Sequence, residues 1–382
     1  MTLRIDGARV LLPDHGLAET AVTLADGRIA AIGAGGGGRA LDAAGLLLLP
    51  GVVDLHGDAF ERQLMPRPGV VFPIDAALVD TDRQLVANGV TTALHGLTWS
   101  WEPGLRGREA ARNFLDALNR LRPVLAADNR VHLRYEIYNT DAAAEIGEWL
   151  AAGLIDLLAF NDHLPMFLRR VGQPSRLVQY AERAGMGVED FIALLHRVAE
   201  REPLVGPANR RLAETARLCG VPLASHDDET PAMRRHFHDL GCALCEFPVD
   251  SITARAARDM GDGVIMGAPN VLRGRSHTEG GMRAADLAAA GLVDALASDY
   301  YYPALPLAPF RLVRDGVLPL ERAWDLVSSG PARLAGLADR GAIAKGLRAD
   351  LVLIDDSMPA LPRVIATIVA GRVVHAVRDM MR

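Results

Sequence analysis

Lysine is almost absent from this sequence. Lys345 is the single lysine among 41 basic residues, so the others are all arginine. A mechanism that needs a lysine nucleophile, a Schiff base or a carbamylated lysine is therefore excluded unless Lys345 supplies it. A Walker phosphate loop is excluded too, because Gly346 rather than Ser or Thr follows the lysine. The net charge of −6 gives no basic surplus for nucleic-acid binding.

Cysteines are also few, and long apolar runs are missing. Three cysteines argue against a disulfide framework and favour a reducing compartment. Cys242 and Cys245 form one C-x-x-C pair in apolar surroundings, which predicts buried thiols rather than a metal site. The N-terminus has no signal-peptide core, and Pro50 and Gly51 interrupt the run LLLLPGVV. We therefore expect a cytoplasmic protein with no membrane or nucleic-acid partner.

The ends of the chain differ from its middle. Short apolar segments separated by turn residues predict β-strands in residues 1–49 and 341–382. In residues 50–340, short apolar runs alternate with amphipathic helical segments, the pattern of a parallel sheet covered by helices. Eight such runs occur, which fits an α/β protein built on a (β/α)8 TIM barrel. The strand candidates are LLLPGVVDLH, GVTTALH, RVHLRYEIY, IDLLAFNDH, VPLASHDD, ALCEFPV, GVIMGAPN and LVDALASD.

Histidines and carboxylates stand at or near the ends of several of these runs, where the active-site face of a barrel lies. The candidates are His56, Asp58, Glu136, His163, His226 and Asp299. Singly, each has a structural explanation, such as a core histidine, a helix cap or a solvated turn. An unpaired buried carboxylate is costly, however, so Glu136 needs a metal or a partner such as Arg134. Together the set predicts a site for divalent zinc, manganese, nickel or iron.

Longer motifs point to a family. The opening DGRIAAIG and LLLLPGVVDLH and the closing PLERAWDLVSSGPARLAGLADRGAIAKGLRADLVLIDD resemble the amidohydrolase superfamily. GVVDLHGDAFER, GVTTALHG, HLRYEIY, MGAPNVLRGRSH and ASDYY resemble its phosphonate-metabolism branch, whose named activity is α-D-ribose 1-methylphosphonate 5-triphosphate diphosphatase. The resemblance covers the whole chain. It implies a barrel over residues 50–340 and a small β-sandwich domain built from both chain ends, residues 1–49 and 341–382.

The resemblance also implies two divalent metal ions per chain, with zinc favoured. By analogy, the ligands of one ion are His56, Asp58, Glu136 and Asp299, and the ligands of the other are Glu136, His163 and His226. Glu136 takes the bridging place that a carbamylated lysine has in many relatives, since the barrel contains no lysine. Asp299 also accepts the proton of the attacking hydroxide and passes it to the leaving group.

Arginines and histidines near the strand ends are the first candidates for binding substrate. Guanidinium groups match phosphate oxygens, which favours Arg273 and Arg275 in NVLRGRSH, although both also suit an ordinary surface loop. Four further candidates are Asn270 and His277 in the same loop, Arg67 in PRPGV, and His95 at the end of GVTTALH.

The expected function is hydrolysis of α-D-ribose 1-methylphosphonate 5-triphosphate with release of pyrophosphate, by attack of a metal-bound hydroxide. Loops 59–61, 162–167 and 276–280 depart from the branch pattern. An amidase or deaminase acting on a cyclic amide or N-acyl amine therefore stays as the alternative, and a noncatalytic metabolite-binding barrel is a third. We expect a phosphorylated small molecule as ligand and a homo-oligomer, with a dimer favoured.

Overall fold

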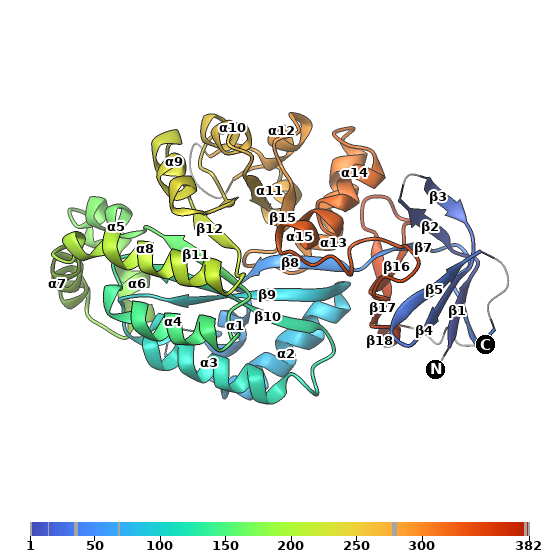
Figure 1. Cartoon of the computed structure of the whole chain (residues 1–382), viewed down its shortest axis with the longest axis horizontal. Coiled ribbons are helices and arrows are strands. Elements are labelled where there is room, and N and C mark those ends of the chain that lie inside the picture. The colour runs from blue at the N-terminus through green and yellow to red at the C-terminus, as the bar shows by residue number, and fades with distance from the viewer. Residues whose placement is uncertain are drawn as a thin grey trace.

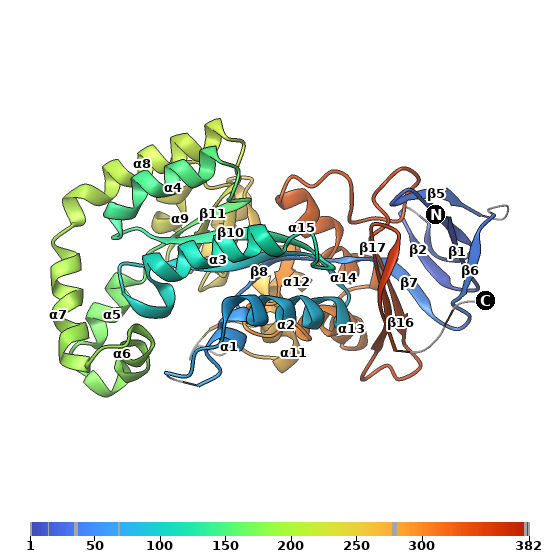
Figure 2. The same cartoon turned by 90° about the horizontal axis from the view of Figure 1, so that it is seen from below.

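The computed structural model describes residues 2–13, 15–33, 37–67, 69–276, 281–377 and 380. A barrel forms the middle of the molecule, with β-sheets from both chain ends at one side of it and a helical insertion at the other (Figures 1 and 2). Within the described ranges, no helix is both long and apolar enough to cross a membrane.

The barrel contains eight parallel strands in sequence order. They are β8 (Val52–Gly57), β9 (Val90–Trp99), β10 (Asp128–Glu136), β11 (Leu157–Asn161), β12 (Leu223–His226), β13 (Leu244–Glu246), β14 (Gly263–Gly267) and β15 (Ala295–Ala297). Main-chain hydrogen bonds from Asp299 N to His56 O and from Asp58 N to Asp299 O, at 2.8 and 2.9 Å, join the last strand to the first. The predicted (β/α)8 barrel is confirmed.

Helices follow the strands and cover the outside of the barrel. They are α1 (Phe60–Leu64), α2 (Ile74–Ala87), α3 (Arg108–Leu121), α4 (Ala143–Ala151), α5 (Leu164–Arg170), α6 (Val178–Ala184), α7 (Val188–Ala199), α8 (Glu202–Leu218), α9 (Pro231–Leu240), α10 (Ser251–Asp259), α11 (Ala268–Arg273), α12 (Ala284–Ala289), α13 (Ala304–Arg314), α14 (Leu320–Asp325) and α15 (Ser329–Leu334). Short 3-10 turns lie at Gly104–Arg106, Thr140–Ala142 and Pro174–Arg176.

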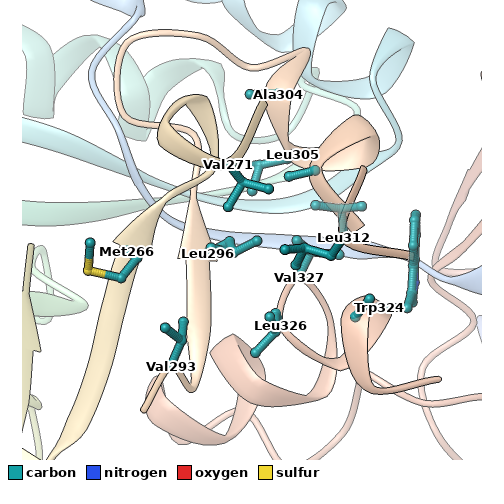
Figure 3. Close-up of a cluster of buried hydrophobic side chains, with 14 of the residues drawn as sticks. Met266, Val271, Val293, Leu296, Ala304, Leu305, Leu312, Trp324, Leu326 and Val327 are labelled. Carbon is teal, nitrogen blue, oxygen red and sulfur yellow. The ribbon is translucent and has the colours of Figure 1, made fainter. Parts of the chain in front are cut away.

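Apolar layers lie on both faces of the barrel sheet. Small and branched side chains such as Val53, Ala159 and Ile265 fill the interior, as expected for parallel strands that are buried on both sides. Figure 3 shows part of the outer layer, where Leu296 of β15 packs near Leu312 of α13. The interior and the outer layer of the barrel therefore contain packed apolar side chains.

Two sheets from the chain ends form the sandwich that the sequence predicted. One has the order β5-β4-β1-β6 and the other β18-β17-β16-β7-β2-β3. The strands are β1 (Leu3–Asp6), β2 (Arg9–Leu12), β3 (Gly16–Glu19), β4 (Val22–Ala25), β5 (Arg28–Ile32), β6 (Arg39–Asp42), β7 (Leu47–Pro50), β16 (Leu351–Asp355), β17 (Arg363–Val369) and β18 (Arg372–Ala376). Ile5, Leu48 and Leu353 belong to one shared apolar cluster, so the sheets have a core of their own.

The longest insertion of the barrel lies between β11 and β12 and contains α5 to α8. Trp101, Phe167 and Phe191 pack with other apolar residues of α5, α6 and α7 in a separate cluster. Because α5 starts three residues after β11 ends, this helical cluster lies at the carboxyl ends of the strands, opposite the sandwich. We call this end of the barrel the mouth.

Candidate metal centre

The structure brings all six predicted ligand residues to the mouth. His56, Asp58 and Asp299 have ligand atoms within 4.8 Å of one another, and we call them the Asp58 group. The same is true of His163, His226 and Asp227, which we call the His226 group. Glu136 is next to the second group, because its Oε1 lies 2.5 Å from Nδ1 of His163.

Main-chain geometry assembles the Asp58 group. The hydrogen bonds that close the barrel hold Asp299 between His56 and Asp58. Asp299 has a φ of 54°, and Asp227 and Phe247 at neighbouring strand ends have φ values of 57° and 54°. Non-glycine residues in this left-handed region cost free energy and cluster at functional sites. The mouth therefore combines close carboxylates with a strained backbone.

Burial and like charge act on Asp299. Burial is the main cause that raises its pKa to about 8, and the carboxylate of Asp58 adds to the effect. A bound cation would reverse this, since an opposite charge at close range favours the ionised carboxylate.

Opposite charges dominate around His163. Burial acts to lower its pKa, but the carboxylates of Glu136 and Asp227 raise it to about 10. Conversely, burial acts to raise the pKa of Glu136, and His163 is the main partner that lowers it below its usual value. Glu136 therefore has a partner in His163, and its carboxylate charge is retained inside the protein.

Strand β10 contributes three side chains to the interior, because successive inward positions on a strand are two residues apart. His132, Arg134 and Glu136 occupy these positions. Sequence considerations named Arg134 as a possible partner of Glu136. In the structure its guanidinium instead donates to Asp58 Oδ2 at 3.1 Å and lies 3.2 Å from His226 Nε2.

Comparisons with known proteins agree with this geometry. A model of the Amidohydrolase family matches residues 186–375. The alpha-D-ribose 1-methylphosphonate 5-triphosphate diphosphatase of Escherichia coli (strain K12) is 33% identical over 327 residues, which cover 82% of this chain and 85% of the relative. The chain belongs to the amidohydrolase superfamily. Within the superfamily it falls in the phosphonate-metabolism branch, and it is a hydrolase.

More distant members share the architecture. A dihydroorotase of Geobacter sp. (strain M21) is 26% identical over 93% of this chain and 90% of the relative. A crystal structure of an amidohydrolase from an environmental sample of the Sargasso Sea has a TM-score of 0.68 and 15% identity, and covers 98% of this chain and 93% of that one. At that identity the solved structure supports the fold alone.

Amidohydrolases typically use divalent metals, and the donors at the mouth suit such an ion. Nε2 of His56 is buried and has no hydrogen-bond partner among the described residues, which is unusual for a buried polar atom. Burial, with Arg134 and His226, lowers the pKa of His56 well below its usual value, so the ring is neutral. Nδ1 lies 3.2 Å from Glu246 Oε2, which places the proton on Nδ1 and the lone pair on Nε2.

Sequence reasoning missed Glu246, Asp227 and His132. Glu246 ends β13, is fully buried, and also lies 3.5 Å from His132 Nε2. The sequence could have indicated Glu246, because this residue stands near the end of an apolar run just as Glu136 does. Asp227 directly follows His226 in an acidic run, His226–Asp227–Asp228, that equally suits a solvated turn, so the sequence alone did not mark it. His132 could have been found from its spacing of two residues from Arg134 on one strand face.

The prediction that His95 faces the mouth is wrong. Its ring packs against Phe60, and Nε2 lies 2.8 Å from Asn129 Oδ1. The neighbouring residue Gly96 faces His56, since a Cβ built on it would lie 3.3 Å from Nε2 of that ring. Successive strand residues face opposite sides. His95 therefore points outward into the layer between strand and helices.

The other substrate-binding candidates lie in the segments that follow β8 and β14, or outside the described residues. Asn270 uses its side-chain amide to hold the main chain, donating to Met282 O at 3.0 Å and accepting from Ala284 N at 2.9 Å. Arg273 and Arg275, at and just beyond the end of α11, are exposed, as is Arg67 after α1. His277 lies outside the described residues. The structure thus gives Asn270 a bracing contact, and the substrate roles of the arginines stay predictions.

Proposed function

We propose that this amidohydrolase releases pyrophosphate from α-D-ribose 1-methylphosphonate 5-triphosphate. The observation that carries the proposal is the 33% identity, over most of both chains, with a protein of that named activity. Water adds to a phosphorus of the triphosphate, the phosphoanhydride bond breaks, and the products are pyrophosphate and a ribosyl 5-phosphate that keeps the methylphosphonate. The clustering of imidazoles and carboxylates at the mouth supports metal-dependent hydrolysis of this kind.

The proposed metal ligands follow the two groups. One ion would be held by the Asp58 group with Glu136, and the other by Glu136, His163 and His226, with Asp227 beside them. Zinc is favoured, and manganese, iron or nickel would suit the same nitrogen and oxygen donors. A divalent ion bound there supplies Lewis acidity, which lowers the pKa of coordinated water and polarises a phosphoryl oxygen.

The chain's own residues would orient the reactants and move the proton. Glu246 fixes the tautomer of His56 through Nδ1. Asp299, held between His56 and Asp58 by main-chain hydrogen bonds, would accept the proton of the attacking water on a carboxylate oxygen and return it to the leaving pyrophosphate. Arg273 and Arg275 would bind phosphate oxygens from the end of α11.

A second candidate function is hydrolysis of a cyclic amide. The dihydroorotase relative, 26% identical over nearly the whole chain, favours it. The same ligands would serve, with a carbonyl carbon in place of phosphorus. A cyclic amide offers Arg273 and Arg275 no phosphate to bind, so the effect of these arginines on substrate affinity separates the two candidates.

The deciding experiment measures phosphate products and ring opening with the same metal-replete preparation. We expect wild type to release pyrophosphate from the ribosyl triphosphate and to show no detectable hydrolysis of dihydroorotate. Arg273→Ala should raise KM for the ribosyl triphosphate. Ring opening of dihydroorotate without pyrophosphate release would replace the proposal with the second candidate. The proposal places the enzyme in the cytoplasm, since its three cysteines are free, and as a homo-oligomer, with a dimer favoured.

A further inference from the structure

The guanidinium of Arg134 lies between the Asp58 group and the His226 group. Nη1 donates to Asp58 Oδ2 at 3.1 Å, and Nη2 lies 3.2 Å from Nε2 of His226. The Arg134 side chain is only 7% exposed, so water cannot easily take over either contact. One positive charge therefore touches a candidate ligand of each metal ion.

The contact with His226 fixes where its ring proton is. Arginine can only donate, so Nε2 of His226 accepts and its lone pair points at the guanidinium. The proton of the neutral ring must then be on Nδ1, which lies 3.3 Å from Asp227 Oδ2 but makes no hydrogen bond among the described residues. The lone pair on Nε2 is therefore the one that the neutral ring has for a metal ion.

The two contacts of Arg134 differ in what they permit. A carboxylate has two oxygens with about four lone-pair sites in total, so Asp58 can bind an arginine and a metal ion together. Nε2 of His226 has a single lone pair. It can accept from Arg134 or bind a metal ion, but it cannot do both.

We propose that Arg134 is a built-in cation that competes with a metal ion for Nε2 of His226 and so makes the two metal sites unequal. The Asp58 group binds its ion tightly. The His226 group binds its ion only when Arg134 gives up Nε2, so this second ion is the exchangeable one. The inference rests on the proposed metal-dependent function, but it concerns ion binding and requires no substrate.

The test is calorimetric titration of zinc into metal-stripped, full-length protein without substrate. Wild type should show two classes of site. Arg134→Met keeps the length of the side chain and removes its charge and donors, so the weaker class should tighten by about tenfold or more, as expected when a unit charge at contact distance is removed. An unchanged or weakened second class in Arg134→Met would overturn the inference.

Arg106→Met is the matched control. Arg106 also carries a positive charge at the mouth, with Nη2 3.9 Å from Asp58 Oδ2, but its hydrogen bonds go to Glu61. Removing it lowers the local positive charge and leaves the contact with His226 in place. We expect the weaker class to change by about twofold at most, since the remaining effect is a screened charge effect. Equal tightening in both variants would show a general charge effect and overturn competition for His226.

A third variant covers the case in which Arg134→Met does not fold. Arg134→Lys keeps the charge but lacks the planar fork that reaches both partners. The weaker class should then tighten by about threefold, and wild-type affinities for both classes would contradict the inference.

The outcome for this inference is separate from the outcome for the proposed function. Two unequal classes of zinc site that converge in the Arg134 variants, in a protein that releases no pyrophosphate from the ribosyl triphosphate, would support the inference and rule out the proposed substrate. A wild type that binds no zinc would overturn both.

Discussion

Arg134 and Arg234 are both buried against acidic partners in the barrel, yet their surroundings differ. Arg234, on α9, is fully buried and makes four hydrogen bonds, to Ser225, Asp228 and two main-chain carbonyls. These contacts tie a helix to two neighbouring strands. Arg234 therefore has the surroundings of a structural clamp.

Arg134 has fewer hydrogen-bond partners than Arg234. It contacts one carboxylate and one imidazole, close to a ring nitrogen of His56 that has no partner among the described residues and to Asp299, whose pKa is raised to about 8. Burial of an arginine is thus common to both regions. Unsatisfied atoms occur in both regions, since Nε of Arg234 and Oδ1 of Asp228 also have no hydrogen-bond partner among the described residues. What distinguishes the mouth is the cluster of imidazoles and carboxylates that could hold a metal ion.

The largest expected effect is on catalysis at the mouth. Asp299→Asn keeps the size of the side chain but cannot accept a proton, so kcat should fall by about 10²–10⁴-fold, the usual contribution of a general base. KM should change little, because substrate binding is assigned to other residues. Steady-state kinetics with metal content measured on the same preparation check this. A kcat within about threefold of wild type at full metal occupancy, far below a general-base effect, would remove Asp299 from the mechanism.

For Arg234, the structural clamp, we expect an effect on stability rather than on catalysis. Arg234→Met leaves the buried carboxylate of Asp228 without its counter-charge, which should lower the free energy of unfolding by about 3–5 kcal/mol. Chemical denaturation measures this, and Arg235→Met, an exposed arginine on the same helix, is the control. Zinc affinity should stay as in wild type. A large loss of zinc binding at full folding would break the distinction between clamp and mouth.

Glu246 tests whether a residue behind the ligands belongs to the mouth. Glu246→Gln weakens the acceptor that orients His56, and such changes typically cost about 10–100-fold in metal affinity. Competition with a chelator at neutral pH would measure it. Wild-type affinity would show that His56 is held by packing alone, and Glu246 would then resemble the clamp.

The smallest effect on activity is expected at His95. His95→Phe removes the hydrogen bond to Asn129 and keeps an aromatic ring against Phe60 and Phe114. The free energy of unfolding should fall by about 1–3 kcal/mol, whereas kcat and KM should match those of wild type. Thermal denaturation and kinetics on one preparation would check both. A rise in KM with unchanged stability would restore His95 to the substrate site.

Much of the mouth could be predicted because a parallel barrel places all carboxyl strand ends on one face. That rule needs only the strand runs, and it found His56, Glu136 and His226 without any knowledge of contacts. It failed for His95, because β9 continues to Trp99 and inward and outward positions alternate along a strand. The pairing of β8 with β9 shifts register between Asp54 and Gly57, and no local pattern in the sequence marks that shift.

The sequence by itself determined the order of strands and helices, the lack of a barrel lysine and the residue types at the strand ends. Those properties are local, since they follow from apolar periodicity and from the identity of single residues. Only the tertiary structure decided that Arg134 contacts Asp58 and His226 rather than Glu136, and that Glu246 lies behind His56. These contacts join strands separated by up to 190 residues, and closure of the barrel, not local pattern, sets which side chains meet across it.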